Sequence, residues 1–99
     1  MNRLKILVVD DTKAILKMAK FVLSDKYDVY LSNSGELALE ILNRKPIDIV
    51  LMDVDMPDMD GVEIIKRIRT WSNVPIIVIS ARSEDADKIE ALDAGADDY

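Results

Sequence analysis

The sequence predicts an α/β fold in which helices cover both faces of a parallel sheet. Short apolar runs typical of buried strands alternate with longer segments of helical periodicity along the 99 residues. Strands that alternate with helices form parallel sheets, because each crossover helix returns the chain to the same edge. The length fits one domain, and no repeat or linker interrupts the pattern.

Four apolar runs, at residues 4–9, 27–31, 47–52 and 75–79, are the expected strands. The segments between and after them each present one apolar helical face. These faces consist of Ile15, Leu16, Ala19, Val22 and Leu23 in the first helix, Leu37, Ala38, Ile41 and Leu42 in the second, Val62, Ile65 and Ile68 in the third, and Ala86, Ile89 and Leu92 in the fourth.

Residues with capping chemistry stand at the expected helix ends. Thr12 precedes the first helix, and Asn33 or Ser34 precedes the second, where a side-chain oxygen can accept from a free N–H. Gly61 opens the third helix. Three acids between residues 84 and 87 suit the first turn of the fourth, and Gly95 suits its C-cap.

The most informative feature is where polar residues follow the strands. Asp10 and Asp11 follow the first strand, Asp53 follows the third, and Ser80 follows the fourth. Ligand sites of open α/β sheets lie at the carboxyl ends of the strands, which meet at one edge. Each acid alone is explained equally well as a turn or cap residue, and Ser80 more readily so. Together at one edge they predict a site.

The chemistry available to this site is that of oxygen ligands. The chain has no His and no Cys, so a bound metal would be a hard cation such as Mg²⁺. Such a cation offsets the repulsion among three neighbouring carboxylates. A carboxylate beside Mg²⁺ can act as a nucleophile towards phosphorus, and the Ser80 hydroxyl can donate to a phosphoryl oxygen. The residues therefore favour phosphoryl transfer onto a carboxylate.

Composition limits the partners of this segment. A net charge of −6 and a pI near 4.5 argue against a nucleic-acid-binding surface, which needs an excess of Lys and Arg. The lack of Cys is compatible with a reducing cytoplasm. The first residues lack a signal-peptide pattern, and no apolar run approaches the roughly 20 residues of a membrane span. We therefore expect a cytoplasmic protein with no membrane contact.

Five motifs, in order and spanning the whole chain, resemble the receiver domains of bacterial response regulators in two-component signalling. They are Val8-Val9-Asp10-Asp11, Leu51-Met52-Asp53-Val54-Asp55-Met56-Pro57, Asp60-Gly61, Val78-Ile79-Ser80-Ala81 and Ala94-Gly95-Ala96-Asp97-Asp98-Tyr99. The last motif, with the residues before it, is most similar to regulators that carry a DNA-binding output domain. The resemblance implies a signalling switch that takes a phosphoryl group from a histidine kinase and controls transcription, with at most self-catalysed phosphoryl transfer and slow autodephosphorylation.

The resemblance also implies a role for individual residues. Asp53 corresponds to the phosphate acceptor, Asp11 to a direct Mg²⁺ ligand, and Asp10 to an acid that binds Mg²⁺ largely through water. The main-chain carbonyl of Asp55 corresponds to a further ligand. Ser80 and Tyr99 correspond to the switch pair, in which the hydroxyl turns towards the phosphoryl group as the aromatic ring swings inward. Further matches are Pro57 and Gly61, which shape the loop, and Asp55 and Arg82, which tune phosphoryl lifetime.

One departure concerns the C-terminus of the chain. Receivers continue past the position of Tyr99 with a strand containing a Lys and with a fifth helix. We therefore expect residues 1–99 to form a C-terminally incomplete receiver of flavodoxin-like fold, with sheet order 2-1-3-4 and without the fifth strand and helix. Ile15, Val22 and Ile79 would border the uncovered area, and exposed apolar surface there would favour self-association or a homodimer.

Two other functions remain open at this point. Residues 53–56 also resemble the first motif of haloacid-dehalogenase-like phosphatases, which use an Asp nucleophile, Mg²⁺ and a Ser or Thr after a strand. Their nucleophile normally follows the first core strand, whereas Asp53 follows the third. A phosphatase would release phosphate repeatedly. The other alternative is a receiver-like module that binds or dimerises without being phosphorylated.

Overall fold

A computed structural model of the chain describes residues 3–53, 61–79 and 95. Strands and helices alternate along these residues, as the sequence predicts. The elements are β1 (Lys5–Val9), α1 (Lys13–Leu23), β2 (Asp28–Ser32), α2 (Gly35–Arg44), β3 (Ile49–Asp53), α3 (Gly61–Arg69) and β4 (Ile76–Ile79). The helix expected around residues 84–92 lies outside the described residues.

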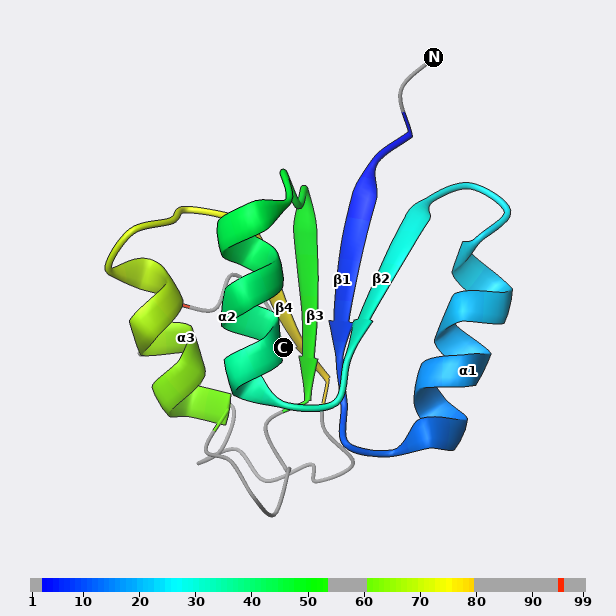
Figure 1. Ribbon diagram of the computed structural model, residues 1–99, viewed down its shortest axis with the longest axis horizontal. Helices are drawn as coiled ribbons and strands as arrows, with labels where there is room; N and C mark the ends of the chain where they lie inside the picture. Colours follow the sequence, from blue (N-terminus) through cyan, green and yellow to red (C-terminus); the bar gives the residue numbers. More distant parts are fainter. Residues whose placement is uncertain (1–2, 54–60, 80–94, 96–99) are drawn as a thin grey trace.

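The strands form a parallel sheet in the order β2-β1-β3-β4. This order confirms the predicted one. Because β1 and β3 are the inner strands, the chain changes direction across the sheet between them, and their carboxyl ends lie at the topological switch point. All four strands run the same way, so their carboxyl ends meet at one edge (Figure 1).

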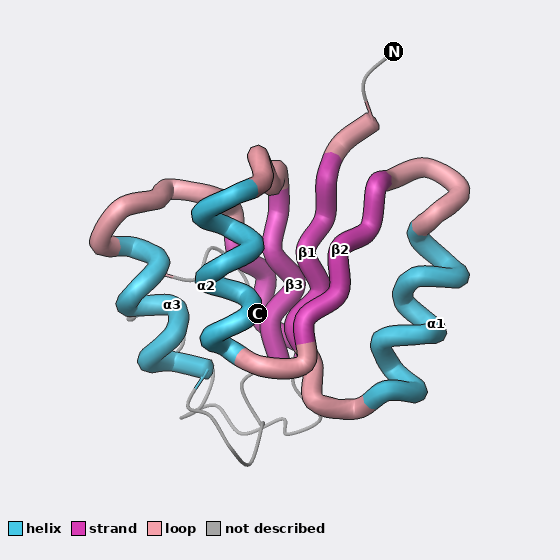
Figure 2. Tube along the Cα trace, viewed as in Figure 1, coloured by secondary structure: helices cyan, strands magenta, loops and turns pink. Residues whose placement is uncertain are grey.

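Helices lie on both sides of the sheet: α1 on one side, α2 and α3 on the other (Figures 1 and 2). Alternate residues of each inner strand supply two separate cores. Leu7, Val9, Val50 and Met52 belong to the larger core, which also contains residues of α2 and α3. Ile6 and Val8 belong to the smaller core, together with Leu16 of α1. Burial on both faces explains why these strands are almost wholly apolar.

The first helix buries less than its apolar pattern predicts. Leu16 is buried and Ala19 and Leu23 pack against the smaller core. Ile15 and Val22 are instead 49% and 62% exposed, and Ile79 at the end of β4 is 54% exposed. Assigning Ile15 and Val22 to the buried face was therefore wrong, while the expectation that these three residues border an uncovered area agrees with their exposure.

The predicted caps of the first three helices are correct in position. Ser34 is the N-cap of α2, and its hydroxyl accepts a hydrogen bond from the N–H of Leu37 at 3.2 Å. Thr12 is the N-cap of α1 but makes no side-chain cap bond. Gly61 begins α3. In the described part of the chain, no helix is long and apolar enough to cross a membrane.

Candidate metal centre at the carboxyl ends of the strands

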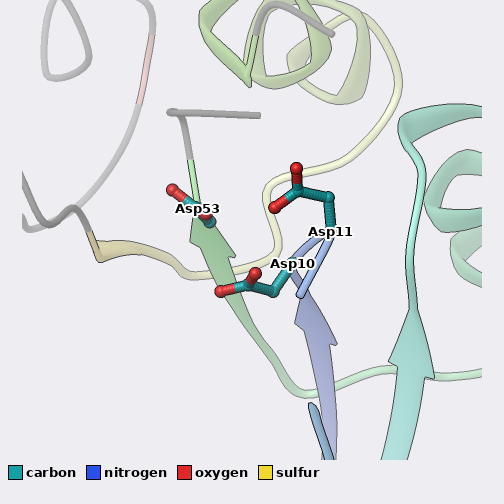
Figure 3. A group of neighbouring side chains, drawn as sticks. All are labelled: Asp10, Asp11 and Asp53. Carbon is teal, nitrogen blue, oxygen red and sulfur yellow. The ribbon is translucent and has the colours of Figure 1, made fainter. Parts of the chain in front are cut away.

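Three carboxylates meet where β1 and β3 end. Asp10 and Asp11 directly follow β1, and Asp53 is the last residue of β3. Val9 pairs with Met52 in the β1–β3 ladder, so the next step of the register sets Asp10 beside Asp53. One carboxylate oxygen from each of the three residues lies within 4.8 Å of the other two (Figure 3). The sequence predicted this group.

Asp10 is held in place by its own surroundings. Its main-chain N–H donates to the carbonyl oxygen of Ser32 at 3.0 Å, which continues the β1–β2 ladder one step beyond the strand. Its side-chain Oδ1 accepts from the main-chain N–H of Thr12 at 2.8 Å. This bond closes a local turn of the kind Asp favours, so the carboxylate is oriented by the backbone.

The connection from β2 to α2 is fixed beside Asp10. The buried hydroxyl of Ser32 donates to the carbonyl oxygen of Ser34 at 2.5 Å and accepts from its N–H at 3.3 Å. The same Ser32 supplies the carbonyl that receives the Asp10 N–H. The sequence analysis did not single out Thr12 or Ser32 for support of the site. The short polar run Ser32-Asn33-Ser34 was the available signal, because Ser and Asn favour such local turns.

The three acids differ in exposure. Asp10 is 7% exposed, Asp53 is half-buried and Asp11 is exposed. A buried carboxylate is tolerated where it is hydrogen-bonded or paired with a cation. The open side at Asp11 leaves the group accessible from solution. An ion can therefore reach the cluster and keep several of its waters, as Mg²⁺ does in most protein sites.

The cluster fits a hard divalent cation. All three potential ligands are carboxylates, and oxygen is the donor that Mg²⁺ prefers. Two oxygens bound to one Mg²⁺ at about 2.1 Å can be at most about 4.2 Å apart. The observed upper separation of 4.8 Å is slightly wider. Small side-chain rotations therefore bring the oxygens to ligand spacing without any backbone change.

The remaining predicted site residues fall outside the described residues. They are Asp55, Pro57, Ser80, Arg82 and Tyr99. Two neighbours of these residues are described. Asp53 pairs with Ile79 in the β3–β4 ladder, and Ser80 is the next residue in sequence. Gly95, four residues before Tyr99, has a φ of +117°. That value lies in a region that residues with a Cβ rarely adopt.

An open parallel sheet with an all-oxygen acidic group at its switch point defines a class of α/β protein that binds a hard cation beside a carboxylate. Within that class the family is settled by sequence: residues 6–99 match the response regulator receiver domain, and this chain belongs to that family. Receivers are the phospho-accepting signalling domains of two-component systems. The match does not favour a phosphatase or an unphosphorylated binding module.

Curated relatives place the chain among transcriptional regulators. It is 47% identical over 96 residues to the KDP operon transcriptional regulatory protein KdpE of Escherichia coli. It is 41% identical over 95 residues to the transcriptional regulatory protein KdpE of Mycobacterium tuberculosis. Each comparison covers 95% of this chain but only 42% of the relative. The chain thus spans less than half the length of these regulators.

Solved receivers share the fold. The receiver domain of the Francisella response regulator 1452 superposes with a TM-score of 0.89 at 34% identity, covering 98% of this chain and 82% of that one. The chemotaxis response regulator CheY4 of Vibrio cholerae gives 0.91 at 31%, covering 98% and 84%. DrrB, a Thermotoga maritima OmpR/PhoB homologue, gives 0.87 at 33%, covering 99% and 45%. The flavodoxin-like fold predicted from the sequence is therefore confirmed.

Proposed function

We propose that Asp53 is the residue of this receiver that accepts the phosphoryl group. The observation that carries the proposal is the meeting of Asp10, Asp11 and Asp53, with oxygens within 4.8 Å of one another at the carboxyl edge of the sheet. Of the three, Asp53 ends the strand that pairs with β4, and so it faces the strand that leads to Ser80. Asp10 is committed to the Thr12 N–H, which suits a fixed ligand better than a nucleophile.

In the proposed reaction a carboxylate oxygen of Asp53 attacks the phosphorus of a phosphohistidine on a sensor kinase. The bond from phosphorus to the histidine nitrogen breaks as the bond to the Asp53 oxygen forms. The histidine nitrogen keeps the electron pair, and Asp53 becomes an aspartyl phosphate. The Ser80 hydroxyl donates to a phosphoryl oxygen, and Tyr99 follows it in a shift between two populations of the domain.

Asp10, Asp11, Asp53 and the carbonyl of Asp55 are the proposed Mg²⁺ ligands. When bound there, Mg²⁺ supplies positive charge that offsets the negative charge of the carboxylates and of the phosphoryl oxygens. The chain itself orients the Asp10 carboxylate through Thr12 and leaves Asp11 open to solution. The nucleophile is thereby held beside two further acids whose mutual repulsion falls when a cation is present.

The expected setting is a cytoplasmic two-component pathway that controls transcription. The kinase is the phosphoryl donor, and DNA contact belongs to an output domain, because the relatives of this chain are transcriptional regulators more than twice its length. Its own charge of −6 makes a nucleic-acid surface on this segment unfavourable. Exposed apolar residues on α1 support self-association or a homodimer as a further property.

The test uses acetyl phosphate as the phosphoryl donor and the intact mass as the readout. With Mg²⁺ the protein should gain one phosphoryl group, and Asp53→Asn or removal of Mg²⁺ should abolish the gain. Asp48→Asn is the matched control, because Asp48 lies just before the same strand and accepts the Lys5 main-chain N–H at 2.7 Å. An unlabelled wild-type protein with a folded circular dichroism spectrum would refute the proposal. Continuous release of phosphate would instead indicate a phosphatase.

A further inference from the structure

Arg69, the last residue of α3, joins two segments of the chain that are far apart in sequence. Its Nε donates to the carbonyl oxygen of Gly95 at 2.8 Å. Its Nη1 donates to the carbonyl oxygens of Val74 at 2.7 Å and Ser72 at 3.2 Å. The side chain is half-buried. One guanidinium therefore connects the loop before β4 with the turn at Gly95.

The fit between Arg69 and Gly95 is close. A Cβ on Gly95 would lie 2.8 Å from Cγ of Arg69 and 3.2 Å from its Nε. The φ of +117° at Gly95 independently disfavours any residue with a side chain. The contact is therefore built from both sides: the backbone conformation requires glycine, and the absence of a side chain lets the guanidinium reach the carbonyl.

This contact lies away from the acidic cluster. The loop between α3 and β4 is at the edge of the sheet where the strands begin, opposite to the edge where β1 and β3 end (Figure 1). The four residues of β4 alone span about 13 Å at about 3.3 Å per residue. Arg69 therefore cannot touch a phosphoryl group on Asp53, and any effect on signalling must act through the chain segments it holds.

Those two segments lead to the two residues of the proposed switch. Val74 lies two residues before β4, and Ser80 directly follows that strand. Gly95 lies four residues before Tyr99. We propose that Arg69 is a positioning residue that fixes Gly95 against the start of β4 and so sets the relative placement of the Ser80 and Tyr99 segments. This inference rests on the proposed function for its signalling consequence, but the positioning itself does not.

Arginine suits this task for a chemical reason. Its guanidinium is planar, permanently charged and carries several N–H donors in a fixed arrangement, so it can serve carbonyls of two segments at once. A lysine ammonium is a compact charge on a flexible stem and lacks that arrangement. Arg69→Lys should therefore keep the charge and lose part of the positioning, whereas Arg69→Met keeps much of the apolar stem and loses all the donors.

The first experiment measures amide hydrogen exchange by NMR in wild type, Arg69→Lys and Arg69→Met. Arg67→Met is the control, because Arg67 is exposed and its ion pairs are with Glu36 and Glu63 at the surface. Exchange at residues 95–99 should rise at least tenfold in Arg69→Met and less in Arg69→Lys, with β1 and β3 unchanged. Wild-type exchange at Gly95 in Arg69→Met, or an equal rise in β1 and β3, would overturn the proposal.

The second experiment reads the switch in the same variants labelled with 3-fluorotyrosine, with Tyr99→Phe assigning the Tyr99 signal. After acetyl phosphate and Mg²⁺, Arg69→Met should gain its phosphoryl group within about twofold of the wild-type rate. Its Tyr99 shift change should be at most half that of wild type, with Arg69→Lys restoring part of it. A full Tyr99 response in Arg69→Met would overturn the coupling. If wild type itself takes no phosphoryl group, the proposed function fails and hydrogen exchange alone decides the positioning role.

Discussion

The two acids that follow β1 have different surroundings although they are adjacent in sequence. The Asp10 carboxylate is buried and accepts the Thr12 N–H, while Asp11 is exposed beside it. Burial and a backbone donor fix the first side chain in place. The second is free to adjust to an ion. This difference predicts that Asp11 contributes chiefly to cation affinity, and that its removal leaves the folded backbone intact.

Replacing Asp11 with Asn should remove most of the stabilisation that Mg²⁺ confers. At a Mg²⁺ concentration ten times Kd, binding to the folded state alone raises the free energy of unfolding by about 1.4 kcal/mol. Thermal unfolding with and without Mg²⁺ measures this difference. Asp25→Asn is the control, because Asp25 is an exposed acid beyond the far end of α1. An undiminished Mg²⁺ effect in Asp11→Asn would argue against Asp11 as a ligand.

At the residue scale, the sequence was informative where chemistry and strand ends coincide. Asp10, Asp11 and Asp53 were identified because acids that end neighbouring parallel strands must meet. Arg69 was missed because its partners are main-chain carbonyls, which carry no sequence signature. Its partner Gly95 was expected to end a helix, and the positive φ agrees with the conformation such a C-cap adopts.

Among the elements, α1 and α2 offer a natural comparison of helix caps. Both begin after a hydroxyl residue with extended backbone, Thr12 and Ser34. Only Ser34 makes the side-chain bond, to the N–H of Leu37. A capping bond of this kind contributes about 1 kcal/mol. Sequence alone treats the two positions as equivalent, because both residues have the right chemistry, and the difference arises from the side-chain orientation at each turn.

Ser34→Ala should therefore lower the free energy of unfolding by about 1 kcal/mol, and Thr12→Ala by clearly less. Urea unfolding of both variants beside wild type gives the two values, provided that the dependence on urea is unchanged. Equal losses would show that the cap at α2 has no special contribution. Because Ser34 also contacts Ser32, the Ser34 value is the upper limit for the cap itself.

Burial of the helix faces was predictable only where the covering layer was known. On α3 the expected Val62, Ile65 and Ile68 are buried, and Ile64 is buried as well. On α2, Ala38 and Leu42 are buried, but Leu37 is 39% exposed. Periodicity identifies the side of a helix that is apolar, but it cannot tell how far the neighbouring elements extend over that side.

At the scale of the whole molecule, the fold was predictable because pattern and connection rules agree. Alternating strands and helices impose a parallel sheet, and short right-handed crossovers limit the possible strand orders. The observed order β2-β1-β3-β4 follows. Less predictable is the outer surface of α1, where Ile15, Met18 and Val22 lie three or four residues apart and remain exposed.

This exposed strip should make the 99-residue chain self-associate. Sedimentation velocity over a concentration series should show a rising sedimentation coefficient for wild type. The double variant Ile15→Ser, Val22→Ser should reduce the rise, because it removes apolar area from that strip. Lys17→Ser on the same helix serves as the control for loss of an exposed side chain. A wild-type protein that stays monomeric up to millimolar concentration would contradict the expectation.

The central claim is that Asp53, and neither of its two neighbouring acids, carries the phosphoryl group. The most direct measurement treats the phosphorylated protein with borohydride, which reduces an aspartyl phosphate to homoserine, and then maps the product by peptide mass spectrometry. Homoserine at position 53, formed only after exposure to acetyl phosphate with Mg²⁺, is the expected result. Homoserine at position 10 or 11, or at no position in a protein whose mass shows a phosphoryl group, would contradict the claim.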